Sequence, residues 1–139
     1  MKKYISIDVG GTAIKYGLIG DGQILSRSTM NTEAEKGGPA VLLKVLGIAG
    51  GFFPQEEISG ICISTAGMVD TEKGVITYAA PLIPDYAGTE YKKAMEERFG
   101  VPCEVENDVN CAGLAESVSG AAKGSRISLM LTVGTGIGG

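Results

Sequence analysis

The chain has 139 residues, 44% hydrophobic and 20% charged, with a formal net charge of −4 at pH 7. This length suffices for one domain with a buried core, and the acidic balance excludes the basic field that binds nucleic-acid phosphates, so no nucleic-acid partner is expected. Histidine is absent, which leaves acid–base chemistry to Asp, Glu, Lys, Tyr or Cys, and the three cysteines lack CxxC spacing, which indicates reduced thiols and a cytoplasmic protein.

Three consecutive antiparallel strands are predicted at the start of the chain. β-branched and apolar residues run from Lys3 to Val9, and they resume from Ile14 to Ile19 after the break at Gly10-Gly11-Thr12. Asp21-Gly22 is a hairpin signal, and the third strand follows it from Gln23 to Thr29. The first glycine loop therefore connects two strands.

Helices and strands alternate in the rest of the chain. Apolar residues at helical spacing, with Pro39 near the start and Gly50-Gly51 at the end, predict a helix over residues 38–53. Its apolar segment is too short, and with Lys44 too charged, to span a bilayer, so no membrane partner is expected. The other predicted elements are a strand over 59–65, a helix with Thr89 as N-cap and Gly100 as its stop, a strand over 103–106, a helix over 109–122 and a strand over 127–133. This order predicts an α/β protein with helices packed on a mixed sheet.

The stretch IDVGGTAIKYG, residues 7–17, is a candidate phosphate loop. Its two glycines let backbone N–H groups approach an anion closely, and Thr12 adds a hydroxyl donor. The loop lies between two strands and contains neither GxGxxG nor GxxxxGK[ST], which separates it from Rossmann and Walker loops. The alternative is an ordinary hairpin turn with Asp8 as a surface acid.

The pair Asn107-Asp108 lies where a predicted strand ends and a predicted helix begins. The helix dipole keeps an aspartate ionised there, so it can accept a hydrogen bond from a substrate hydroxyl. Asn107 can both donate and accept, which suits a sugar hydroxyl. The alternative, favoured when such a pair is taken in isolation, is that the two residues only cap the helix.

The final stretch, LTVGTGIGG, places a second glycine loop after a strand. A single loop of this kind is weak evidence, because glycine-rich tails are common. Two strand-to-glycine loops separated by a helix-capping aspartate are typical of a nucleotide site with an acceptor base between its two loops.

The sequence resembles the ROK family (repressors, open reading frames and sugar kinases). The resemblance rests on five collinear stretches, IDVGGTAIKYG, ISTAGMVD, AAPLIPDY, ENDVNCAGLAE and LTVGTGIGG, and covers essentially all 139 residues. It matches the N-terminal part of the glucokinases, fructokinases and β-glucoside kinases of the family. It implies the ribonuclease H-like fold of actin-like ATPases and hexokinases. Residues 1–122 would form the small lobe, and residues 123–139 the beginning of a C-terminal lobe, truncated after the second phosphate loop.

The resemblance also implies a reaction and a set of site residues. The reaction is ATP-dependent phosphorylation of a sugar hydroxyl, with ATP and Mg²⁺ as cofactors and Asp108 as the catalytic base. Asn107, Gly67 and Ala66 would contact the sugar. The implied cofactor-binding residues are Asp8, which also serves the metal directly or indirectly, Gly10, Gly11, Thr12, Lys15, Gly134, Thr135 and Gly136.

Two positions depart from the pattern of the family. The family usually has proline before the glycine of the Thr65-Ala66-Gly67 loop, and asparagine after Pro81, where this chain has Leu82-Ile83. Both positions border the sugar pocket, so the sequence does not determine which sugar is used.

Several motifs of the family lie downstream of the residues seen here: further sugar-binding Glu and His residues, a cysteine-rich zinc motif and an adenosine-binding segment. We therefore expect an inactive fragment of an enzyme that is a homodimer when full length, with zinc only in the missing part. We also expect the returning strand of the second loop to be missing, and Gly134 to Gly139 to be poorly ordered or held by something other than nucleotide.

Two alternatives stay open. The first is a sugar-sensing transcriptional regulator of the same family, although the kinase-like strand begins at Lys3 and leaves no room for an N-terminal DNA-binding domain. The second is a non-sugar ATPase of the actin-like superfamily, which would give no reason for Asn107-Asp108 at a helix start.

Overall fold

The structure, a computed structural model, describes residues 1–134 and 137–139. Its centre is a five-stranded sheet in the order β3-β2-β1-β4-β7. Strands β1 and β2 pair antiparallel, as do β2 and β3, whereas β1, β4 and β7 run parallel to one another. The predicted mixed sheet is therefore confirmed. Its strands are β1 (Lys3–Val9), β2 (Ala13–Gly20), β3 (Gln23–Asn31), β4 (Ile58–Thr65) and β7 (Cys103–Asn107).

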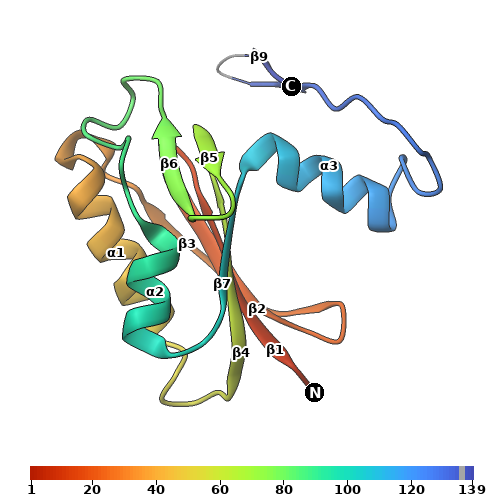
Figure 1. Cartoon of the computed structure of the whole chain (residues 1–139). Helices are drawn as coiled ribbons and strands as arrows, with labels where there is room; N and C mark the ends of the chain where they lie inside the picture. Colours follow the sequence, from red (N-terminus) through yellow and green to blue (C-terminus); the bar gives the residue numbers. More distant parts are fainter. Residues whose placement is uncertain (135–136) are drawn as a thin grey trace.

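One face of this sheet is apolar and carries the core. Every second residue of β1, namely Ile5, Ile7 and Val9, is buried, and Ile61 and Ile63 repeat the pattern on β4. Helices α1 (Gly38–Gly50) and α2 (Tyr91–Phe99) cover this face (Figure 1). The intervening side chains of β1 and β4 consequently point to the opposite, more open face.

The remaining elements follow the ends of the sheet strands. They are the 3₁₀ helix Ala34–Lys36, β5 (Met68–Asp70), β6 (Val75–Tyr78), α3 (Asp108–Ser119), β8 (Thr132–Val133) and β9 (Ile137–Gly138). Strands β5 and β6 form a hairpin, as do β8 and β9. Helix α3 follows β7 directly and extends away from the sheet on the side opposite α1 and α2 (Figure 1). Across the described ranges, the structure contains no helix that is long and apolar enough to cross a membrane.

The predicted helices are confirmed with shifted ends. The helix expected over residues 38–53 ends at Gly50, and the one expected over residues 109–122 begins at Asp108 and ends at Ser119. The prediction that Thr89 caps α2 is wrong. Glu90 occupies the N-cap position without a side-chain cap, and Thr89 Oγ1 instead donates to the carbonyl of Tyr86 at 2.7 Å.

The sequence pattern did not predict the β5–β6 hairpin. These strands have three and four residues, which is too short for a period of two to be recognised. Their position depends on tertiary packing, because Ile76 of β6 is fully buried in the core.

The strand predicted over residues 127–133 is wrong for most of its length. Ile127, Leu129 and Leu131 alternate as in a strand, but all three are exposed, and only Thr132–Val133 is extended and paired. The partner is β9, so the returning strand that we expected to be missing is present as two residues, Ile137–Gly138. Within the described residues, no other strand lies beside this segment to supply hydrogen bonds.

Candidate active site

The carboxyl ends of the parallel strands bring most of the predicted site residues to one edge of the sheet. Adjacent strands are in register there, with Asp8 beside Ser64 and Ser64 beside Glu106. The next row joins the strand ends Val9, Thr65 and Asn107. Gly10-Gly11-Thr12 and Ala66-Gly67 lie in the loops that follow β1 and β4, and Asp108 begins α3 directly after β7. Ligands of open α/β sheets bind in this position.

The first glycine loop is a tight turn between β1 and β2. The Gly10 amide donates to the carbonyl of Ala13 at 3.0 Å, which closes the turn. Among the hydrogen bonds of the described residues, none uses the amides of Gly11 and Thr12. Two free backbone donors in one turn suit an anion such as a phosphate.

Asp8 lies on the open face of β1, next to this turn. Ser64 Oγ donates to Asp8 Oδ1 at 2.8 Å, which fixes the carboxylate and leaves Oδ2 for a ligand. Within residues 1–134 and 137–139, no group of three or more metal-ligating side chains forms. This donor set fits Mg²⁺, which keeps several waters and binds through one or two carboxylates and substrate phosphates.

Lys15 is the cross-strand partner of Asp8 in the β1–β2 hairpin. The two residues line an open groove of about 570 Å³ on the face of β1, β2 and β3 that α1 and α2 do not cover. On β3 the groove is lined from Ile24 to Thr29, and neither Ala66 nor Gly67 is among its lining residues. Lys15 is therefore placed near the predicted metal ligand but not at the predicted sugar position.

Asn107 is the N-cap of α3, so the capping interpretation is confirmed for this residue. Its Oδ1 accepts from the amides of Val109 at 3.0 Å and Asn110 at 3.3 Å. Its Nδ2 donates to the carbonyl of Gly67 at 2.6 Å. Asn107 thus joins the start of α3 to the loop that follows β4, and one N–H of its amide stays available for a ligand.

Asp108 is the first residue of α3 and is exposed. Its Oδ1 accepts from the Val109 amide at 2.9 Å. Its Oδ2 accepts no hydrogen bond among the described residues. The residue therefore meets the geometric requirement for a general base, a free carboxylate oxygen that a substrate hydroxyl can reach.

The loop after β4 requires glycine at position 67. Gly67 has φ +95°, and a Cβ there would lie 2.8 Å from the carbonyl oxygen of Tyr78. Leu82 lies against Gly11 of the first loop and its side chain is 62% exposed, whereas Ile83 is buried in the core. Of the two residues that depart from the family pattern after Pro81, only Leu82 therefore borders the site.

Sequence reasoning missed three groups that support these loops. Glu106 accepts from the Asn107 amide at 2.7 Å and from Asn110 Nδ2 at 3.0 Å. The second group is a buried chain of hydroxyls from Thr65, Tyr86 and Tyr91. The third is Thr32 with Lys44. Only Glu106 had a signal in the sequence, because it directly precedes Asn107.

The hydroxyl chain runs beneath the Ala66 loop through Thr65, Tyr86 and Tyr91. Tyr91 Oη and Tyr86 Oη are 2.8 Å apart, Tyr86 Oη contacts Thr65 Oγ1, and Thr65 Oγ1 donates to the carbonyl of Ala66 at 3.0 Å. Burial raises the pKa of both tyrosines, so both stay protonated and can donate. These hydroxyl groups connect the loop that carries Ala66, a predicted sugar contact, to the core.

Strand β9, which comes after residues 134–136 of the second glycine stretch in the sequence, lies beside the start of α3. A Cβ on Gly138 would lie 2.7 Å from Val109 Cγ2, which places β9 next to the residue that follows Asp108. Gly134 follows β8 and is exposed. Thr135 and Gly136, which we also predicted to bind phosphate, lie outside the described residues.

Comparison with protein families settles the relationship of the chain. The family model described as "ROK family" matches residues 4–139. The chain belongs to the ROK family. Its N-terminal loop, its Asn107-Asp108 pair and its terminal glycine loop are therefore parts of a ROK sequence.

Relatives of this ROK chain include named sugar kinases. It is 52% identical to an uncharacterized protein of Clostridium perfringens over 100% of this chain and 48% of that protein. It is 36% identical to a β-glucoside kinase of Klebsiella pneumoniae and 33% identical to a glucokinase of Thermotoga maritima, over 99% of this chain in both cases. These two matches cover 45% and 43% of the relatives, so the chain spans less than half of the length of the curated relatives that it matches.

Solved structures agree with the fold of this ROK chain. A ROK hexokinase from Thermus thermophilus is 36% identical with a TM-score of 0.81, over 98% of this chain and 45% of that one. A ROK family glucokinase from Streptomyces griseus, in complex with glucose and AMPPNP, is 29% identical with a TM-score of 0.83, over 98% and 43%. The chain thus has the actin-like ATPase fold of ROK sugar kinases, as predicted.

Proposed function

We propose that this ROK chain forms the nucleotide- and sugar-binding N-terminal lobe of an ATP-dependent sugar kinase. Residues 1–122 would be the small lobe, and residues 123–139 the beginning of the C-terminal lobe. The observation that carries the proposal is the placement of the free Asp108 carboxylate oxygen at the same sheet edge as the free amides of Gly11 and Thr12. A base and an anion cradle at one edge are the two parts that phosphoryl transfer needs.

In the proposed reaction, Asp108 accepts the proton of the attacking sugar hydroxyl. The hydroxyl oxygen forms a bond to the γ-phosphorus of ATP, the bond from that phosphorus to the β,γ-bridging oxygen breaks, and ADP leaves. The amides of Gly11 and Thr12 would donate hydrogen bonds to the negatively charged oxygens of the transferred phosphoryl group. Mg²⁺, when bound near Asp8, neutralises charge on the phosphates.

The substrate is proposed to be a hexose or a related sugar, in line with the glucokinase and β-glucoside kinase among the relatives. ATP is proposed as the donor, supported by the AMPPNP in the Streptomyces griseus complex. Asn107, Ala66 and Gly67 would border the sugar, and Gly134, Thr135 and Gly136 would contribute the second phosphate loop. Because positioning by both lobes carries most of the rate, residues 1–139 alone are proposed to be inactive.

The test compares residues 1–139 with the full-length protein, meaning the longest natural protein that contains this chain. ADP release is measured with ATP, Mg²⁺ and a panel of hexoses and β-glucosides, against the same mixture without sugar. We expect sugar-dependent ADP release from the full-length protein only. ADP release that no sugar stimulates would contradict the kinase and favour a non-sugar ATPase, and sugar binding without turnover would favour a regulator.

A further inference from the structure

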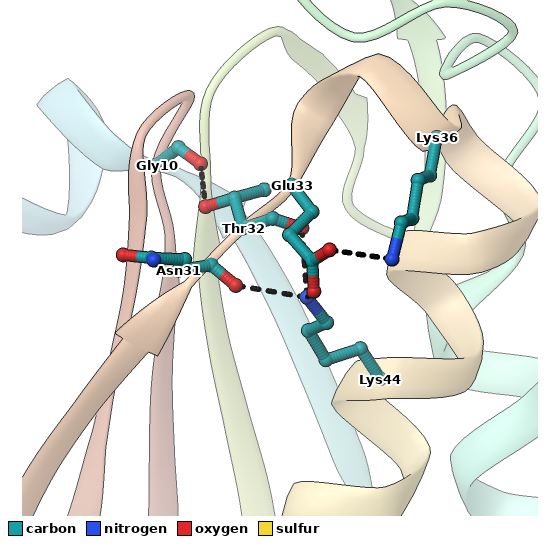
Figure 2. Close-up of polar contacts among 6 residues, drawn as sticks. All are labelled: Gly10, Asn31, Thr32, Glu33, Lys36 and Lys44. Carbon is teal, nitrogen blue, oxygen red and sulfur yellow. Dashed lines mark hydrogen bonds and ion pairs between the residues drawn. The ribbon is translucent and has the colours of Figure 1, made fainter.

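Lys44 on α1 clamps the end of β3. Its Nζ donates to the carbonyl of Asn31 at 2.9 Å, to the carbonyl of Thr32 at 3.1 Å and to Glu33 Oε1 at 2.7 Å (Figure 2). An ammonium group has three protons, so all of its donors are used in this clamp. A lysine whose donors are all engaged by backbone and one carboxylate fixes the chain between β3 and the 3₁₀ helix.

Thr32, which the clamp holds, is bonded to the first phosphate loop. Its Oγ1 donates to the carbonyl of Gly10 at 2.7 Å, and its amide donates to the carbonyl of Thr12 at 2.9 Å. Thr32 is only 1% exposed, so these bonds are shielded from competing water. Figure 2 shows the connection from Lys44 through Thr32 to Gly10.

The two bonds fix which way the loop faces. They hold the carbonyls of Gly10 and Thr12 toward Thr32, while the amides of Gly11 and Thr12 make no hydrogen bond within the described residues. A carbonyl oxygen turned toward a phosphate would repel it, whereas an amide attracts it. The two bonds therefore hold the carbonyls of Gly10 and Thr12 back from a phosphate that the amides of Gly11 and Thr12 would bind.

We propose that Thr32 and Lys44 are positioning residues for the polyphosphate of the nucleotide. Thr32 holds the orientation of the Gly10–Thr12 loop, and Lys44 holds Thr32 in place. The inference rests on the proposed kinase function. A purely structural role would affect only the stability of the lobe. The proposed role also affects the affinity for the nucleotide, because the loop amides are oriented before the nucleotide binds.

The test uses four variants of the full-length protein. Thr32→Val removes the hydroxyl donor and keeps the shape, and Thr32→Ser restores the donor. Lys44→Met removes the ammonium and keeps the stem. Lys92→Met is the matched control, because Lys92 on α2 is also in ion pairs, with Glu96 and Glu104, and its side chain is 25% exposed against 21% for Lys44.

We expect Thr32→Val and Lys44→Met to raise the KM for ATP by up to about tenfold, the scale of one lost hydrogen bond. The KM for sugar should change less than about twofold, because the sugar-side loop has its own supports. Thr32→Ser and Lys92→Met should keep the KM for ATP of the original protein. Equal changes in both KM values, or a lower melting temperature with both KM values unchanged, would overturn the inference.

A second measurement separates this inference from the proposed function. If the full-length protein shows no sugar-dependent turnover, the kinase proposal fails, and the clamp is judged by deuterium uptake of residues 9–13. Faster uptake in Thr32→Val and Lys44→Met than in Thr32→Ser and Lys92→Met supports the positioning of the loop. Equal uptake in all four overturns it.

Discussion

The side-chain amide of Asn107 donates to the carbonyl of Gly67 at 2.6 Å and thereby joins the start of α3 to the loop after β4. The same side chain caps α3 through its oxygen. Asn107 therefore sets the position of Asp108 relative to the proposed sugar loop. Because its oxygen caps the helix and its nitrogen bonds Gly67, a substitution can remove one role and keep the other.

Asn107→Asp should keep the cap and lose the bond to Gly67. Aspartate caps helices as well as asparagine does, but its carboxylate cannot donate to a carbonyl. We expect a loss of about 1–2 kcal/mol in the free energy of unfolding, from urea denaturation of residues 1–139. Asn107→Ala should lose about 1 kcal/mol more, because the cap also disappears. Equal stability of Asn107→Asp and the original chain would show that the bond to Gly67 contributes nothing.

Asp108→Asn should remove the proposed base. In the full-length protein we expect the rate of sugar-dependent ADP release to fall by about 10²-fold or more, with little change in sugar affinity. Asp21→Asn is the matched control, since Asp21 lies in the β2–β3 turn with φ +50°, a conformation that asparagine also adopts. An unchanged rate in Asp108→Asn would leave Asp108 with a structural role only.

Gly67→Ala should destabilise the chain by about 1–3 kcal/mol, because alanine is strained at φ +95° and its Cβ would meet the carbonyl of Tyr78. Gly47→Ala is the opposite case. Gly47 lies within α1, and a Cβ there would meet nothing within 4 Å, so this change should stabilise by up to about 1 kcal/mol. Melting curves of both variants check the pair, and a stabilising Gly67→Ala would contradict the structure of the loop.

Glu33 should make the free energy of unfolding of the chain depend on pH in acidic solution. Hydrogen bonds and charge from Lys36 and Lys44 lower the pKa of this carboxyl from 4.5 to about 2. A lowered pKa in the folded state contributes stability that is complete above pH 4.5 and is lost as the pH falls toward 2. Because the Glu33 side chain is 41% exposed, the effect should be small and should weaken at high salt.

The comparison for this prediction is Glu33→Gln. The difference in melting temperature between this variant and the original chain should be largest above pH 4.5 and should disappear as the pH falls below about 2. A difference that stays constant over this range would show that the ion pairs do not lower the pKa of Glu33 in solution.

Much of the architecture was readable from local patterns. Runs of β-branched and apolar residues are sufficient to predict β1 and β2, each of which has one buried face, and the Asp21-Gly22 hairpin signal is sufficient to predict β3 after them. The glycine pair at Gly10-Gly11 marks a turn for a backbone reason, and Asn107 marks a helix start because its side chain bonds the backbone next to it. These features depend on neighbours within a few positions, so a sequence contains them in full.

The tertiary structure alone decided how the site is supported. Thr32 reaches Gly10 across 22 positions, and Asn107 reaches Gly67 across 40. Neither a threonine after a strand nor a lysine within a helix indicates which carbonyl it will bind. The sequence by itself determined the ROK pattern, the strand ends and the loops that carry the candidate residues. The partners that orient those loops follow only from the register of the sheet, since long-range hydrogen bonds depend on distances that the fold creates. The antiparallel pairing of β3 with β2 brings Thr32 to the first loop, and the parallel pairing of β4 with β7 brings Asn107 to Gly67.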